Sequence, residues 1–524
     1  MSEHKAIFKS ASIISGFTVV SRLTGFIRDV LIANLFGTGA AAQAFFVAFK
    51  IPNAFRDVMG EGAGNAAFVP VFCEYLEKKT RAEFLRLVNS LLWVMVVISS
   101  TFTLLGIIFS PVIIHLVAPG FYADIEKFNL AVNLNRYLFP YLILITVSAY
   151  LMSVSNALKS FAVPASSSIV FNIALIGGIY LIIKASLPNP VYALCIATLI
   201  AGVIQVLVQL PSLRHAGIDF KKGGFYPSLF KEPALRKVGR LILPRLAGTS
   251  IYQLNLFVDT IFASLAVFVG DGAIAAIYYA NRIIQFPFAI FGVALSNAAL
   301  PNMSANSARD EVENFKKTLL FCLKSVFLGV LPVTVGILIF SEPLVRVIFQ
   351  RGSFDAHSTH ITARAVFFFA FGLVSYVGVR FMSHGFYALQ DTRTPVKTSG
   401  VGLVLNIVLN SIFILLFKFG IAGLGLASSI SATVNFYLLY RVMRQRIGFR
   451  FGSEFRLLIV KSFLSSLAMG ILIFYVWQMW AQEHANFFKL FAVAGLGALS
   501  YMVFLRLAKV REVEDLSAWL RKKR

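Results

Sequence analysis

Charged residues and cysteines are scarce in this chain. Of its 524 residues only 14% are charged, whereas 58% are hydrophobic. A soluble protein of this length needs a far more polar surface, so the composition excludes a soluble globular fold and indicates a polytopic membrane protein. The three cysteines, Cys73, Cys195 and Cys322, are scattered among apolar segments, which excludes a disulfide framework and a cysteine-based metal site.

Motifs of the common enzyme classes are also missing. The glycines of GEGAG (60–64) have neither the lysine nor the spacing of a nucleotide-binding loop. His357 and His360 lie close to Asp355, but they fall where a helix is expected to begin, so a metal site is the less favoured interpretation. Few of the 24 acidic residues fall inside apolar segments, which argues against a Mg²⁺-dependent enzyme acting on lipid phosphates. The sequence therefore predicts a protein that is not an enzyme.

Long apolar segments fill most of the sequence. Runs of about 20 apolar residues with short polar breaks predict membrane-spanning helices rather than barrel strands, hence an all-α polytopic membrane protein. About fourteen spans are expected, near 11–36, 41–75, 87–116, 128–157, 163–183, 190–212, 236–266, 272–303, 314–341, 359–388, 395–418, 421–445, 456–479 and 486–508.

Lysine and arginine are concentrated in alternate loops. The chain carries 48 of them against 24 acidic residues, a formal net charge of +24. If the N-terminus is cytoplasmic, most basic residues outside the spans fall on the cytoplasmic side, as the positive-inside rule requires. We therefore expect both termini in the cytoplasm and a first span that is retained rather than cleaved as a signal peptide. The positive charge then faces anionic lipid, and no nucleic-acid partner is needed to explain it.

A duplicated pattern divides the chain. Asp29 opens DVLIANL and Asp259 opens DTIFASL, FFVAFK (45–50) aligns with IYYANR (277–282), and NAA (65–67) recurs at 297–299. The first two spans then correspond to the seventh and eighth, an even offset that gives both halves the same orientation. Transporters built from such parallel repeats bind substrate at the interface of the halves. We expect six-helix lobes at 1–213 and 214–446, and two additional helices in 447–524.

Charged residues inside the spans mark the candidate site. A charge within the bilayer costs about 2.5–3.5 kcal/mol on insertion scales and usually faces a partner or a water-filled cavity. Arg22 and Asp29 share one face of a helix, and the duplication aligns Lys50 with Arg282. Arginine suits bidentate binding of phosphate or carboxylate. These cations predict an anion-binding cavity. The alternative is an internal Arg22–Asp29 ion pair, with the other arginines reaching the headgroups.

Four segments resemble the MurJ/MviN family of lipid II flippases, in the superfamily of multidrug, oligosaccharidyl-lipid and polysaccharide exporters. They are SRLTGFIRD (21–29), AFFVAFKIPNAFRDVMGEGAGNAAFVPVF (44–72), YYANRIIQFPFAIFGVALSNAALP (278–301) and GFYALQDTRTPVK (385–397). The resemblance implies fourteen helices, two of them forming a groove for the lipid tail. It further implies transport of a peptidoglycan precursor across the cell inner membrane, with the cell-wall synthesis machinery as a possible partner. The pyrophosphate of the lipid-linked substrate would bind at Arg22, Arg28, Arg56 and Arg282, with Asp29 and Glu61 as acidic members and Lys50 added by the duplication.

The chain departs from the family pattern at two positions. Gln43 and Asn281 stand where many relatives have an acid, which leaves the acid-dependent steps of the family in doubt here. Some members of the family bind Na⁺ as a possible coupling ion, and by similarity Asp259, Asn406 and Asn410 would supply oxygen ligands. Polar packing between helices explains these three residues equally well.

Three classes of function stay open at this point. The first is a flippase for lipid II, driven by an ion gradient or the membrane potential because the chain has no ATP-binding motif. The second is an exporter of another polyprenyl-linked saccharide or of drug-like molecules on the same fold. The third is a membrane scaffold, which would not need arginines inside its spans.

Overall fold

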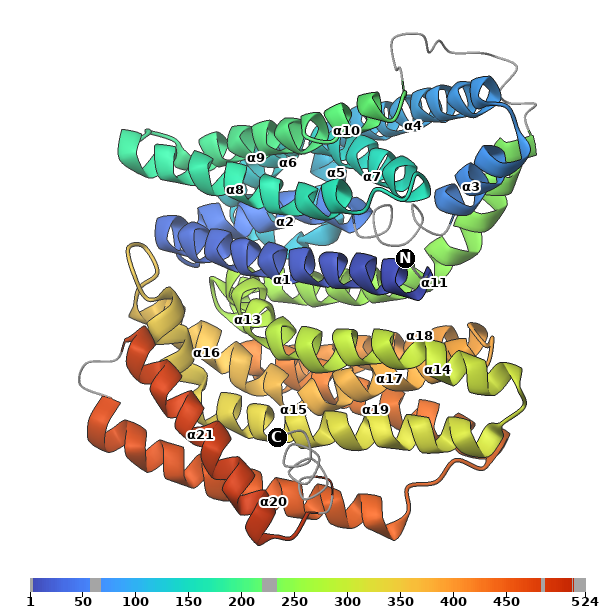
Figure 1. The fold of residues 1–524 in the computed structure, drawn as a ribbon. Helices are drawn as coiled ribbons and strands as arrows, with labels where there is room; N and C mark the ends of the chain where they lie inside the picture. The colour runs from blue at the N-terminus through green and yellow to red at the C-terminus, as the bar shows by residue number, and fades with distance from the viewer. Residues whose placement is uncertain (1–2, 57–66, 219–232, 482–485, 511, 513–524) are drawn as a thin grey trace. The chain divides into compact units, whose positions relative to one another are not determined.

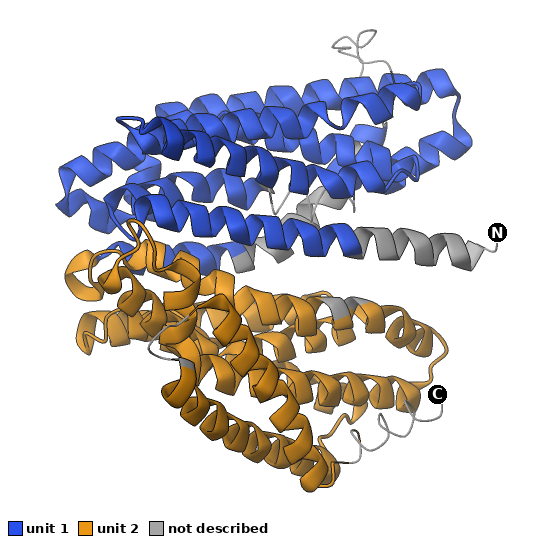
Figure 2. Cartoon of the chain, turned by 60° about the vertical axis from the view of Figure 1, so that its left-hand side comes forward, with its two compact units in different colours: residues 1–265 blue, residues 266–524 orange. Residues whose placement is uncertain are grey.

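The computed structural model describes residues 3–56, 67–218, 233–481, 486–510 and 512, and within these ranges it consists of helices joined by short loops (Figure 1). The contacts between Cα atoms divide the chain into two compact units, residues 1–265 (unit 1) and 266–524 (unit 2) (Figure 2). The expectation of an all-α protein is confirmed for the described residues.

Unit 1 contains eleven α-helices in its described part. The tightest pairs join α1 to α8, α8 to α9, α2 to α6 and α4 to α7. The helices are α1 (Glu3–Phe36), α2 (Ala40–Arg56), α3 (Val69–Lys78), α4 (Arg81–Ile108), α5 (Ser110–Val117), α6 (Ile125–Leu138), α7 (Tyr141–Ala157), α8 (Ala162–Ala185), α9 (Pro190–Leu207), α10 (Leu210–His215) and α11 (Pro233–Ser264), with a short 3₁₀ turn η2 (Pro119–Ala123).

Unit 2 continues with ten α-helices in its described part. Its strongest packing joins α15 to α16 and α20, α16 to α13, α20 to α21, and α19 to α16, α17 and α18. The helices are α12 (Ala266–Val269), α13 (Ala273–Pro287), α14 (Leu295–Ala308), α15 (Val312–Phe349), α16 (Ala356–Ala370), α17 (Leu373–Ala388), α18 (Arg393–Asn410), α19 (Ile421–Ile447), α20 (Ser453–Val476) and α21 (Phe487–Leu507), with π-helical segments η4 (Phe288–Ala294), η5 (Ser411–Leu416) and η6 (Trp477–Ala481).

Eleven of the fourteen ranges expected from hydropathy correspond to apolar helical segments of the described part, whereas 11–36, 41–75 and 236–266 do not. In the described part, ten helical segments are long and apolar enough to cross a membrane, or eleven if α16 and α17, bent by 47° at their junction, form one span. The total of fourteen stays a prediction. Contacts group α11 with α3, α5 and η2 in unit 1, whereas the duplication assigns its sequence to the second lobe. The lobe boundaries at 213 and 446 therefore also stay predictions.

Aromatic rings hold α3, α4 and α7 together in unit 1. The ring of Phe72 meets Phe84 and Tyr150 edge-on, with centroids 6.2 and 5.7 Å apart. The hydroxyl of Tyr150 donates to the carbonyl of Val88 at 2.7 Å. Edge-to-face pairs add about 0.5–1.5 kcal/mol beyond the burial of their surface. This cluster gives unit 1 a packed core of its own.

A glycine sets the spacing of two helices in unit 2. A Cβ at Gly425 in α19 would lie 2.6 Å from the Cβ of Phe368 in α16 and 2.9 Å from the backbone carbon of the same residue. No side chain fits at such distances, so the two backbones approach only because position 425 lacks one. Small residues have this role in membrane helix packing generally.

The last two helices pack on α15. The rings of Phe340 in α15 and Trp477 at the end of α20 meet edge-on with centroids 5.5 Å apart. The hydroxyl of Tyr501 in α21 donates to the carbonyl of Leu328 in α15 at 2.9 Å. The additional pair of helices expected from the sequence is thus anchored to unit 2 through one long helix.

Loops of the same shape precede α8 and α18. The segments ALKSFAVP (157–164) and ALQDTRTP (388–395) begin at the last residues of α7 and α17. The third residue of each has a left-handed backbone conformation, with φ 60° at Lys159 and φ 57° at Gln390. In unit 2 the next residue, Asp391, accepts from the backbone N–H groups of Arg393 and Thr394 at 3.0 Å each and pairs with Arg446 of α19 at 2.6 Å. Asp391 therefore caps α18 and ties it to α19.

We expect Asp391→Ala to lower the melting temperature of the purified protein at neutral pH, because loss of a helix cap costs about 1 kcal/mol. Burial of Asp391 opposes its ionisation, but hydrogen bonds from Thr394 and the charge of Arg446 outweigh burial and hold the pKa of this carboxyl below its usual value. The stabilisation is therefore complete above the unfolded-state pKa and is lost as the pH falls through the lower folded-state pKa. The difference in melting temperature between Asp391→Ala and the unaltered protein should therefore decrease as the pH is lowered.

Glu342→Ala is the matched control for this prediction. Glu342 pairs with Arg346 at 2.8 Å, but both side chains are half exposed, so the pair contributes little. Equal melting temperatures for Asp391→Ala and the unaltered protein at neutral pH would contradict the capping role.

Candidate substrate-binding site

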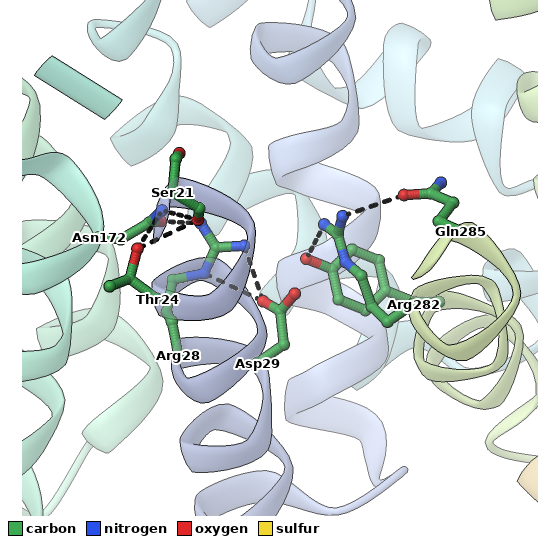
Figure 3. Close-up of polar contacts among 8 residues, drawn as sticks. Ser21, Thr24, Arg28, Asp29, Asn172, Arg282 and Gln285 are labelled. Atoms are coloured by element: carbon green, nitrogen blue, oxygen red, sulfur yellow. Dashed lines mark hydrogen bonds and ion pairs between the residues drawn. The ribbon is translucent and has the colours of Figure 1, made fainter. Parts of the chain in front are cut away.

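Arg28 and Asp29 form a buried ion pair on α1, and α8 completes it (Figure 3). The Nε and Nη2 of Arg28 donate to Oδ1 of Asp29 at 3.0 and 2.7 Å. The Nη1 of the same guanidinium donates to Oδ1 of Asn172 in α8 at 3.0 Å. Arg28 is 7% exposed and Asp29 1%. The sequence analysis selected both charged residues but not Asn172, which is one of several uncharged polar residues of α8.

Asn172 is itself held in place by α1. Its Nδ2 donates to the carbonyl of Ser21 at 3.1 Å and to the hydroxyl of Thr24 at 3.3 Å. Gly25 makes this approach possible, since a Cβ at that position would lie 3.3 Å from the same Nδ2. The carboxamide therefore has a fixed orientation, with its oxygen presented to Arg28.

These contacts leave part of the guanidinium available. Arginine carries five N–H donors, and the bonds to Asp29 and Asn172 use three of them. The charge of Arg28 is compensated by one carboxylate and its orientation is fixed from two helices. Such a group can bind an oxyanion with its remaining donors without having to reorganise.

Lys50 connects α2 to α11 within unit 1. Its Nζ donates to the carbonyl of Leu256 at 2.6 Å and to the hydroxyl of Thr260, and it lies 5.8 Å from the ring centroid of Phe257. The buried carboxylate of Asp259 attracts the same ammonium group. Lys50, predicted as a substrate contact, is therefore engaged with α11 in this structure.

Arg282 in unit 2 is held by uncharged neighbours on its own helix, α13. Its Nη2 donates to the hydroxyl of Tyr278 at 2.7 Å, and the guanidinium carbon lies 4.7 Å from the centroid of that ring. Its Nη1 contacts Oε1 of Gln285 at 3.5 Å (Figure 3). The cation–π contact stabilises the positive charge without neutralising it. Tyr278 and Gln285 are functional candidates that the sequence analysis did not single out.

The remaining predicted site residues have different positions. Arg22 is exposed on α1. Gln43 is buried in α2 and donates to the carbonyl of Thr38 at 3.3 Å. Arg56 is the last residue of α2, and its side chain, like the whole of Glu61, lies outside the described residues. The predicted combination of these residues in one cavity therefore stays a prediction.

Asn406 and Asn410, the expected Na⁺ ligands of α18, are fully buried and share one helix face. The Nδ2 of Asn410 donates to Oδ1 of Asn406 at 3.0 Å, and the Nδ2 of Asn406 donates to Ser428 of α19 at 3.1 Å. Carboxamide and hydroxyl oxygens are suitable ligands for a hard cation. The side-chain oxygens of these residues are therefore of the type that binds Na⁺. Asp259 belongs to unit 1.

His357 and His360 lie in the first turns of α16. Asp355 caps this helix by accepting from the N–H of Ser358 at 2.8 Å. No group of three histidine, cysteine or acidic side chains suited to a metal ion occurs among the residues that the structure describes. The preferred interpretation of this segment as a helix start is confirmed.

We expect Gly25→Val to destabilise the protein, because the added side chain would displace Asn172 from α1, and overpacking of this kind costs about 1–3 kcal/mol. Gly16→Val is the matched control on the same helix, since a Cβ there meets no atom within 4 Å. The measurement is the melting temperature of each variant alone and combined with Asn172→Ala. Because Asn172→Ala makes room, Gly25→Val should cost less in that background. Equal costs in both backgrounds would show that Gly25 does not act through Asn172.

Known proteins resemble this chain over almost its full length. Residues 32–495 match the family described as lipid II flippase MurJ. A probable lipid II flippase MurJ of Haemophilus influenzae is 34% identical, over 87% of this chain and 90% of its own. The lipid II flippase MurJ of Burkholderia cenocepacia is 34% identical over 84% of each chain.

A solved structure gives the same result. It is described as lipid II flippase MurJ in an inward closed conformation, and it matches with a TM-score of 0.78 at 26% identity, covering 94% of this chain and 98% of its own. Family, relatives and fold agree with the resemblance of the four sequence segments. The chain belongs to the MurJ family of lipid II flippases.

Proposed function

We propose that this protein is a flippase that moves lipid II from the cytoplasmic to the outer leaflet of the bacterial inner membrane. Its family and its relatives support this function. The observation that carries the proposal is the buried guanidinium of Arg28, fixed by Asp29 and Asn172 with donors unused. A transporter of a lipid-linked pyrophosphate needs such a group inside its spans, whereas a scaffold does not.

The geometry suggests how the headgroup is bound and released. The planar fork of Arg28 suits bidentate contact with a phosphate, and Arg282 of unit 2 offers a second fork oriented by Tyr278. Asp29 compensates Arg28 when no substrate is bound, so the empty site does not contain an isolated charge. The same compensation weakens the grip on the anion, which favours release after the two units have exposed it to the other side.

The direction of transport depends on orientation and on an energy source. The distribution of lysine and arginine supports placement of both termini in the cytoplasm. A membrane potential supplies about 2.3 kcal/mol per charge per 100 mV, and an ion gradient adds to it. By similarity to the family, Asn406 and Asn410, with Asp259, would supply oxygen ligands for Na⁺ as a coupling ion.

The lipid tail requires an apolar path beside the headgroup site. A groove of about 410 Å³ lies between α15 and α20, lined by Ile339, Gly470, Ile471, Phe474 and Tyr475. All but one of these residues come from α20, the first of the two helices that follow the duplicated part. We assign the tail to this surface. Another polyprenyl-linked saccharide would share the pyrophosphate and the tail, so the saccharide chemistry has to be tested directly.

We expect Arg28→Ala and Arg282→Ala to abolish transport, because each removes a phosphate-binding fork. Arg282→Ala should leave expression unchanged, whereas Arg28→Ala also removes the ion pair of the buried Asp29, so its transport is compared per amount of folded protein. Arg28→Lys should restore only part of the activity, since a point charge replaces bidentate contact. The measurements are growth of cells depleted of their own lipid II flippase and the appearance of lipid II in the outer leaflet.

Arg136→Ala in α6 and Arg364→Ala in α16 are the matched controls, because both arginines are exposed on their helices. Both control variants should support growth. Normal growth of Arg28→Ala and Arg282→Ala would refute the assignment of these arginines to the substrate site, and accumulation of a different polyprenyl-linked saccharide on depletion would refute lipid II as the cargo.

A further inference from the structure

Two basic residues of α17 have no role in the site described so far. Arg380 and His384 lie one turn apart in this helix of unit 2, close enough for the charge of Arg380 to act on the imidazole. Arg380 makes no hydrogen bond or ion pair within the part of the chain that the structure describes, and its Nε is buried without a partner. His384 is 6% exposed; its imidazole forms a hydrogen bond with the backbone of Ser296, whereas its Nδ1 is buried and unpaired among the described residues.

Three other cations of unit 2 illustrate how such charges are paired with carboxylates. Lys316 pairs with Glu313 at 2.7 Å, Lys324 with Glu512 at 2.8 Å and Arg346 with Glu342 at 2.8 Å. These partners make the charges tolerable where they lie near apolar surface. Arg380 differs from them, because no described acid is within ion-pair distance of it.

The fold of the helix does not require these cations. The equivalent loops that follow α7 and α17 set the register of the two helices, so that Arg380 corresponds to Ala149 and His384 to Ser153. The intervening large residues agree with this register, since Phe381 and Tyr150 are both fully buried. In unit 1 the hydroxyl of Ser153 simply donates to the carbonyl of its own helix at Ala149. The same helix position therefore packs well with small residues.

An unpaired cation inside a spanning helix is costly to place in a bilayer. Helix packing does not explain why Arg380 is present, because the corresponding helix of unit 1, α7, packs without a cation at this position. A ligand that supplies negative charge would explain it. The chemistry fits an oxyanion, since the guanidinium presents N–H donors. The imidazole already uses one N–H on the backbone of Ser296, so its Nδ1 adds a further donor only when the bound anion is accompanied by a proton on the ring.

We propose that Arg380 and His384 form a second oxyanion-binding subsite in unit 2, which takes an anionic group of the transported headgroup. This inference rests on the proposed function. The anion is either a phosphate of the pyrophosphate or a carboxylate of the peptide that the headgroup carries, two sources with the same recognition chemistry. Arg380 is the principal contact and His384 the adjoining one.

Binding to purified protein in lipid nanodiscs tests the proposal and separates the two sources. The probes are lipid II and the corresponding polyprenyl-pyrophosphate disaccharide without peptide, each titrated into the unaltered protein, Arg380→Met, Arg380→Lys and Arg364→Ala. Loss of a charge-assisted hydrogen bond should weaken binding about tenfold or more in Arg380→Met. If the subsite binds a carboxylate, Arg380→Met should lose affinity for lipid II only. If it binds a phosphate, the variant should lose affinity for both probes. Arg380→Lys should recover part of the affinity, and the exposed Arg364 should not matter.

Thermal unfolding without substrate distinguishes a binding role from a structural one. Removal of a charge that has no described partner and whose Nε is buried should leave the melting temperature of Arg380→Met unchanged or raise it. A lower melting temperature together with unchanged affinity for both probes would overturn the subsite. If Arg28→Ala still loses affinity in that experiment, only the subsite fails. If Arg28→Ala also binds both probes normally, the proposed function fails with it.

Discussion

A guanidinium buried among membrane-spanning helices needs compensation, and in unit 1 the arrangement of α1 and α8 provides it. Asp29 supplies the opposite charge to Arg28 and Asn172 fixes the remaining edge of the group. Burial raises the strength of these contacts, because little water competes for them. The contacts to Asp29 and Asn172 use only three of the five N–H donors of Arg28, however, so an oxyanion can still bind to the others. Stability without substrate and attraction for substrate thus arise from the same few contacts.

The two units hold their cations by different physical means. Unit 1 neutralises Arg28 with a carboxylate and ties Lys50 to backbone and hydroxyl oxygens of α11. Unit 2 places Arg282 over the face of Tyr278 and leaves Arg380 without a described partner. An aromatic face weakens a positive charge far less than a carboxylate does.

Hydropathy predicted the spans because it is a local property of the chain. The expected range 421–445 became α19, Ile421–Ile447, and 486–508 became α21, Phe487–Leu507. The contacts of the site were harder to predict, because they depend on which helices pack together. Arg22 and Asp29 share a helix face, yet the structure pairs Asp29 with the adjacent Arg28 and recruits Asn172 from a distant helix. Arg380 and His384 lay in a predicted span but were not singled out. Only the fold shows which side chains lie around them and which of their nitrogen atoms are buried without a described partner. The sequence duplication could not predict that α11 groups with unit 1 either, because this grouping depends on contacts of α11 with α3, α5 and η2.

The central claim is that arginines within the spans bind the pyrophosphate of the cargo. An experimental structure of the protein with lipid II bound tests it most directly. We expect pyrophosphate oxygens within hydrogen-bond distance of the guanidinium of Arg28, whose bonds to Asp29 and Asn172 are retained or exchanged for the ligand, and a second contact at Arg282. A bound lipid II whose pyrophosphate lies away from both arginines would contradict the account.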